Sequence, residues 1–109
     1  MMTEQFSIYK SIYKAIDNYL SEHPEHEEEL EPWLSEANPE IWGDEGSGDP
    51  AVYEDFKAFL AKIDYSSLPT FQIAKLYFAQ LDDFYVGTIK IVAGLDEKEF
   101  NSLLAKSSN

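Results

Sequence analysis

The sequence has no cysteine and no arginine. Its 109 residues carry 8 lysines against 21 aspartates and glutamates, which gives a formal net charge of −13 at pH 7. Without cysteine, the chain cannot form disulfides, thiolate zinc sites or a thiol nucleophile. The excess of acids argues against direct binding of nucleic acid, because that affinity comes mainly from Lys and Arg contacts with phosphates.

Long hydrophobic runs are also missing. The most apolar stretch, residues 71–95, is interrupted by charged and amide side chains, whereas a membrane span needs about 20 mostly apolar residues. Residues 1–5 contain no basic region followed by an apolar run, so we expect no secretory signal. These features favour a cytoplasmic location and no contact with a membrane.

Apolar residues are nevertheless frequent enough for a folded core. They make up 44% of the chain and aromatic residues make up 15%, which excludes a disordered acidic tail as a description of the whole. A length of 109 residues predicts one domain, residues 1–109.

The negative charge is concentrated in one third of the chain. Residues 22–55, here called the acidic segment, contain 13 acids and no lysine, while the remaining residues contain 8 acids and 8 lysines. A surface of one sign attracts a partner of the opposite sign. The alternative is a solvated connection between two better-packed parts, because charge runs are often only solvated.

Apolar residues recur at helical spacing along most of the chain. We predict a first helix from Thr3 to Ser21 and a weaker helical segment over 24–38, interrupted at Pro32, with Leu30, Trp33, Leu34 and Ala37 on its apolar face. Three glycines within residues 43–48 predict a loop. Asp49 and Pro50 have the residue types of a helix start, and this next helix is expected to reach about Asp64.

The last third of the sequence predicts two more helices. A long one follows Pro69 and continues to Gly94, bent at Gly87, although residues 86–92 are rich enough in β-branched side chains for a strand. The other begins at Asp96, where Leu95, Glu99 and Phe100 complete a capping pattern. The fold class is therefore all-α: a single-domain compact bundle of four to six helices with an acidic, partly irregular connection.

Three patterns were considered as sites of chemistry. His23 and His26 could hold Zn²⁺ or Ni²⁺ with a nearby glutamate, but Pro24 lies between them and disturbs the geometry. The loop after Gly43 does not place ligands and glycine as a Ca²⁺-binding loop requires, and Ser47 lacks the glycine spacing of a nucleophile elbow. We predict no metal, no cofactor and no catalytic residue.

The acidic segment also contains candidate contacts for a protein partner. Trp33 and Trp42 lie among its acids, and large aromatics beside charge are typical of interface hot spots. The alternative is that both tryptophans hold a weakly helical segment against the bundle. The predicted partner-binding residues are Glu25, Glu27, Glu28, Glu29, Glu31, Trp33, Trp42, Glu45 and Asp49.

The profile of a small, acidic, helical and cysteine-free chain is similar to that of bacterial immunity proteins that neutralise basic nuclease toxins, and of phage proteins that imitate the charge of DNA. This resemblance lies in composition and carries no site residue. It implies a non-catalytic binding module for a basic protein. The alternative is a small structural or regulatory subunit that forms a homodimer through its aromatic helix faces.

Overall fold

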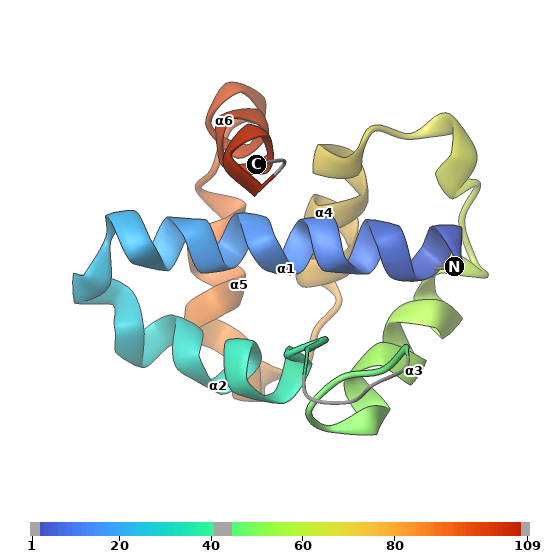
Figure 1. Ribbon diagram of the computed structural model, residues 1–109, viewed down its shortest axis with the longest axis horizontal. Coiled ribbons are helices and arrows are strands. Elements are labelled where there is room, and N and C mark those ends of the chain that lie inside the picture. Colours follow the sequence, from blue (N-terminus) through green and yellow to red (C-terminus); the bar gives the residue numbers. More distant parts are fainter. Residues whose placement is uncertain (1–2, 41–44, 108–109) are drawn as a thin grey trace.

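The first helix crosses the whole molecule and the others pack around it. The computed structural model describes residues 3–40 and 45–107. In these residues it has six α-helices, three short 3-10 helices and no strand, so the predicted all-α class and helix number are confirmed. Figure 1 shows α1 (Glu4–Glu22) running along the longest axis, with α2 below it and α6 above it.

Helix α1 begins and ends where its sequence predicts. The Thr3 hydroxyl accepts a hydrogen bond of 3.2 Å from the backbone N–H of Phe6, which caps the N-terminus. Its buried side chains repeat every three or four residues and pack against α2, α3, α4 and α6; they are Phe6, Tyr9, Ile12, Tyr13, Ala15 and Ile16.

The chain then turns through the 3-10 helix η1 (Pro24–His26) into α2 (Glu27–Ala37). The predicted interruption at Pro32 is wrong, because Pro32 lies inside α2. Its ring removes one helical hydrogen bond, to the carbonyl of Glu28, an exposed residue. Burial of the predicted apolar face compensates for that loss; its members are Leu30, Trp33, Leu34 and Ala37.

Helix α3 (Pro50–Leu60) follows the glycine-rich loop, of which residues 43 and 44 lie outside the described part. The Asp49 carboxylate accepts a hydrogen bond of 3.0 Å from the Ala51 N–H, which confirms the predicted cap. The backbone N–H of Asp49 also donates to the Glu36 carbonyl at 2.7 Å. These two bonds fix the start of α3 beside the end of α2.

The predicted long helix over residues 70–93 is wrong. The chain forms α4 (Thr70–Ala79), the 3-10 helix η3 (Asp83–Tyr85) and α5 (Val86–Ala93). The break comes before Gly87, at Asp82, whose carboxylate accepts a 3.0 Å hydrogen bond from the Phe84 N–H and so begins a new turn. The strand considered for residues 86–92 is a helix.

Gly87 has a packing role. A Cβ atom at this position would lie 2.8 Å from the Cβ of Glu29, so only glycine lets α5 approach α2 this closely. The neighbouring Thr88 hydroxyl donates to the Glu29 carbonyl at 2.8 Å. The glycine that the sequence pattern assigned to a bend is therefore a contact point between two helices.

The last helix, α6 (Glu97–Ser107), packs against α1. Its predicted start is confirmed, because the Asp96 carboxylate accepts a 2.7 Å hydrogen bond from the Glu99 N–H, and Leu95 and Phe100 are both buried. Asn18 of α1 donates to the Leu103 carbonyl at 3.1 Å. Within the part of the chain described, no helix has the length and apolar character to cross a bilayer.

Candidate functional site: an acidic surface and an apolar groove

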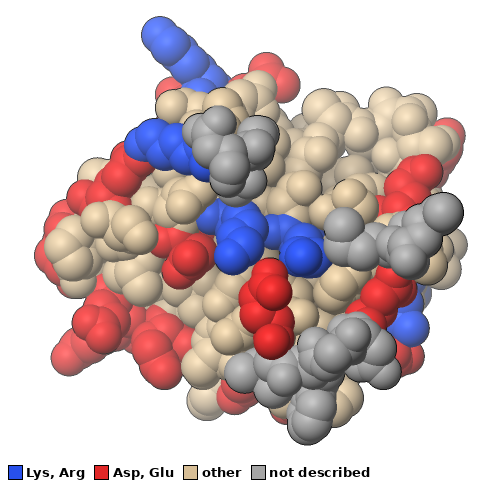
Figure 2. Space-filling model, in the orientation of Figure 1, with Lys and Arg blue, Asp and Glu red and all other residues tan. Residues whose placement is uncertain are grey.

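Five glutamates of η1 and α2 project from one end of the molecule. All five are exposed in the structure. Figure 2 shows red side chains gathered at the lower left of this face, over the region where Figure 1 places the start of α2. We call this group the α2 acidic surface; its members are Glu25, Glu27, Glu28, Glu29 and Glu31.

The lysines of the chain lie elsewhere. Among the described residues, no lysine nitrogen lies within 4 Å of a carboxylate of the α2 acidic surface. The lysine ion pairs use other acids: Glu40 with Lys10 and Lys14, Glu54 with Lys57, and Glu22 with Lys106. The α2 acidic surface therefore keeps its negative charge.

Two histidines border this surface. His23 lies 3.6 Å from Glu25, and His26 lies 3.7 Å from Glu29, measured from Nδ1 to the carboxylate oxygen. The pKa of Glu25 is lowered, first by a hydrogen bond with its own backbone and then by the two imidazoles. The residues of known placement include no group of three His, Asp or Glu side chains arranged to hold a metal ion.

Glu45 and Asp49 lie apart from the α2 acidic surface. Glu45 accepts two hydrogen bonds from Thr3, of 2.6 Å from its N–H and 2.9 Å from its hydroxyl, at the N-terminus of α1. Glu25 follows the other end of α1, and 19 helical residues span about 28 Å. Asp49 caps α3. The eight predicted residues that the structure describes thus do not form one continuous surface.

Trp33 corrects the predicted pair of anchors. Its side chain is fully buried, in contact with the rings of Tyr13 and Phe78, with centroids 5.7 and 4.9 Å away. It cannot serve as an exposed anchor without opening the core. The alternative interpretation of Trp33, that it holds α2 against the bundle, describes its position; Trp42 lies outside the described residues.

Ser47 is also part of the folded interior. Its buried hydroxyl donates to the Asp49 carbonyl and accepts a 3.0 Å hydrogen bond from the Tyr53 N–H. Asp49, which ends the loop that was compared with a Ca²⁺-binding loop, uses one carboxylate oxygen to cap α3. Both residues therefore stabilise the entry into α3.

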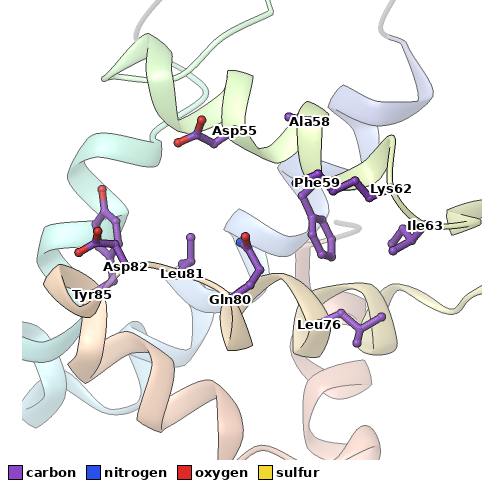
Figure 3. A pocket seen from close by; sticks show the side chains of 10 residues that line it. All are labelled: Asp55, Ala58, Phe59, Lys62, Ile63, Leu76, Gln80, Leu81, Asp82 and Tyr85. Atoms are coloured by element: carbon purple, nitrogen blue, oxygen red, sulfur yellow. The ribbon is translucent and has the colours of Figure 1, made fainter.

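A groove between α3 and α4 was missed by the sequence analysis. It has a volume of about 640 Å³. The lining is mainly apolar, with charged side chains at both ends (Figure 3), and consists of Asp55, Ala58, Phe59, Lys62, Ile63, Leu76, Gln80, Leu81, Asp82 and Tyr85. The sequence signal was Leu76, an apolar residue off the three- and four-residue spacing that joins Ala74 to Tyr77 and Phe78, but such positions are common on protein surfaces.

The aromatic helix faces, considered for self-association, are used inside the chain. Phe56 contacts the rings of Tyr9 and Tyr77 edge to face, with centroids 5.1 and 4.9 Å apart. These three side chains and Phe78 are at most 1% exposed. Ring–ring contacts of this kind stabilise the core of one chain and leave these faces covered.

Comparison with models of known protein families, with curated proteins and with solved structures gives no match to this chain.

Proposed function

We propose that this chain is a non-catalytic acidic binding module that engages a basic protein partner through the α2 acidic surface. The observation that supports this proposal is that, in the described part of the chain, no lysine lies within 4 Å of these five carboxylates, although the chain contains eight lysines. Unneutralised charge on one surface raises the association rate with a basic protein and orients it on approach.

The glutamates also have a local role that the experiment must separate from binding. Glu27, Glu28 and Glu29 lie in the first turn of α2, where negative charge stabilises the positive end of the helix dipole. Glu31 lies beyond that turn, and it borders a hollow with Glu27, Glu28 and Pro32. If the glutamates served only to stabilise the helix dipole, removing the charge of Glu31 would not change binding.

Two variants of equal net charge test the proposal. The first carries Glu27→Gln, Glu28→Gln and Glu31→Gln; the second carries Glu4→Gln, Asp83→Asn and Glu97→Gln, which are exposed acids near the starts of three other helices. A lysine decamer serves as the probe. Its association rate is measured by stopped flow at several salt concentrations, because screening weakens exposed charge pairs.

We expect the first variant to bind the decamer roughly tenfold more weakly than the second, since exposed ion pairs contribute about 0.2–1 kcal/mol each. The association rate of the parent protein should fall steeply between low and physiological salt. Equal loss in both variants, or a rate independent of salt, would show that the acidic segment serves solubility alone.

The more specific form of the proposal is an immunity or inhibitor protein for a nuclease-type toxin, and its other form is a DNA-charge mimic, both acting in the cytoplasm. A reading frame for a basic nuclease beside the gene would favour the first form. Its purified product should then lose nuclease activity when the parent protein is added, and keep more of it with the Glu27, Glu28 and Glu31 variant.

The alternative function, a self-associating structural or regulatory subunit, has less support because its aromatic faces are covered by the core. Sedimentation separates the two. A monomer at micromolar concentration is expected for the binding module, whereas a stable dimer would favour the alternative.

A further inference from the structure

The groove between α3 and α4 combines apolar walls with an uneven distribution of charge. Figure 3 shows Asp55, Asp82 and Tyr85 toward one end, and Lys62 and Ile63 toward the other. The Tyr85 hydroxyl donates a 2.6 Å hydrogen bond to Glu36, which adds a third carboxylate near the first end. One end of the groove is therefore strongly acidic.

Two exposed apolar side chains, Leu76 and Phe84, lie at the same groove. Three large hydrophobic residues are notably exposed in the described chain: Leu76 at 38%, Val86 at 48% and Phe84 at 62%. Leu76 lines the groove, and the Phe84 ring contacts that of Tyr85 at its acidic end, with centroids 5.1 Å apart. Clustered exposed apolar side chains with a polar rim mark interaction sites.

The groove offers an occupant almost no hydrogen bonds along its floor. The Gln80 amide already donates to the Tyr77 carbonyl at 2.9 Å, and the Tyr85 hydroxyl already donates to the Glu36 carboxylate. The walls are formed by parts of α3 and α4 and by the turns that follow them. In these turns the backbone N–H groups already donate to the last carbonyls of the two helices; they are those of Lys62, Ile63, Gln80 and Leu81. An extended peptide would leave its own backbone unsatisfied here, whereas a helix satisfies its backbone itself.

The dimensions also suit a helix. The lining residues run from Asp55 to Ile63 on one wall and from Leu76 to Tyr85 on the other. Nine helical residues would extend about 13 Å, which matches two to three turns of a ligand helix. A second copy of this chain is a poor occupant because both copies would carry a net charge of −13.

We propose that the groove between α3 and α4 binds an amphipathic helix of a partner protein, with apolar side chains against Phe59, Ile63 and Leu76 and with Lys or Arg at the end that meets Asp55 and Asp82. This surface is distinct from the α2 acidic surface, and the proposal does not depend on it. The groove supplies burial of apolar area, and the two carboxylates fix the direction of the helix.

The probe is a fluorescent 12-residue helical peptide with leucines on one face and two arginines at one end. A scrambled peptide of the same composition, without a continuous apolar face, is the control ligand. Fluorescence anisotropy measures both against the parent protein. The parent should bind the helical peptide at least roughly tenfold more tightly than the scrambled one.

Ala58→Gln tests the location because Ala58 is exposed on α3 and lines the groove, so a longer side chain narrows the groove without disturbing the core. Ala51→Gln, at an exposed alanine of the same helix outside the groove, is the matched control. We expect Ala58→Gln to weaken peptide binding at least tenfold and Ala51→Gln to change it less than about twofold.

The double variant Asp55→Asn, Asp82→Asn tests the acidic end of the groove; Asn at position 82 keeps the oxygen that caps the next turn. The parent protein should bind the peptide with terminal arginines more tightly than one with glutamines in their place. The double variant should bind both peptides equally. Binding of the peptide with terminal arginines should be nearly unchanged in the variant with Gln at positions 27, 28 and 31. Binding of the lysine decamer should weaken in that variant and stay unchanged in Ala58→Gln. The two proposals can therefore fail independently.

Several results would overturn the groove proposal. They are an absence of peptide binding up to about 1 mM, equal effects of Ala58→Gln and Ala51→Gln, and equal binding of the helical and scrambled peptides. A parent dimer that Ala58→Gln dissociates would assign the groove to a second copy. If decylamine binds in the groove more tightly than the peptide does, the groove is a site for a small apolar amine.

Discussion

The phenolic hydroxyl of Tyr9 donates a hydrogen bond of 2.6 Å to the carbonyl oxygen of Ala37, the last residue of α2. Tyr13, one turn further along α1, donates to the Leu34 carbonyl at 3.1 Å. The last carbonyls of a helix have no partner within it. Two tyrosines of α1 therefore complete the C-terminus of α2 and align the helix that carries the α2 acidic surface.

Tyr9→Phe should lower the free energy of unfolding by about 1–3 kcal/mol, because a buried carbonyl loses its donor. Chemical denaturation measures this change. Tyr65→Phe is the control, since Tyr65 is half-buried and its hydroxyl makes no hydrogen bond to any described residue; its effect should stay below about 0.5 kcal/mol. Equal losses in the two variants would argue against a structural role of the Tyr9 bond.

Alkaline pH should unfold the protein cooperatively. Burial raises the pKa of Tyr13 to about 12, assisted by Asp17 and Glu40, and burial likewise raises the pKa of Tyr77 to about 12. The unfolded chain releases these protons near pH 10 while the folded chain retains them. Stability is therefore complete below pH 10 and falls between pH 10 and 12, by about 1.4 kcal/mol per pH unit for each tyrosine.

Denaturation at successive pH values, with tyrosinate absorbance as a second signal, measures that loss. In Tyr13→Phe the free energy of unfolding should fall less steeply with pH above pH 10, because one of the titrating groups is absent. Titration of all tyrosines near pH 10 without unfolding would contradict the burial of Tyr13 and Tyr77.

Gly87→Ala should destabilise the fold by about 1–3 kcal/mol, because its Cβ would lie 2.8 Å from the Glu29 Cβ and 2.9 Å from the Glu29 Cα. Gly94→Ala is the matched control. Its added Cβ would meet the Ile91 carbonyl at 3.5 Å, an ordinary contact, and its backbone is right-handed helical, so we expect no loss or a small gain. Thermal unfolding compares them, and tolerance of alanine at Gly87 would contradict the close contact of α2 with α5.

Lys75→Met should cost about 1–2 kcal/mol of stability. The Lys75 ammonium donates to the Val92 and Ala93 carbonyls, both at 2.9 Å, at the end of α5, where a positive charge also favours the helix dipole. Lys90→Met removes an exposed lysine from the same helix end without a hydrogen bond in the described structure. Urea unfolding should rank Lys75→Met as the more damaging variant; equal losses in the two variants would assign the stabilisation to charge alone.

Local patterns in the sequence predicted the helix starts well. Each cap is a side-chain oxygen that accepts a hydrogen bond from a backbone N–H two or three residues later; the capping residues are Thr3, Asp49 and Asp96. Such a cap depends only on residues within one helical turn. The stripe of α1 was equally clear, because its spacing reflects the helical period. The exposed glutamates of α2 follow in part from composition, since consecutive charges are rarely buried.

The sequence could not separate the acids of the acidic segment by their surroundings. Glu40 meets Lys10 and Lys14, and Glu45 meets Thr3, through contacts across at least 26 residues of chain. Glu27, Glu28 and Glu31 meet no lysine in the described chain. Apart from the local pair of Glu54 with Lys57, tertiary packing determines which carboxylates of the acidic segment are paired with lysine.

The amino-acid sequence by itself determined the all-α class, the caps and the excess of negative charge, because each depends on residues within one helical turn or on composition. Tertiary structure decided that Trp33 is buried, that Gly87 is a contact point, and that α3 and α4 form an apolar groove with an acidic end. These three features join residues distant in sequence, and their physical basis is close packing between helices.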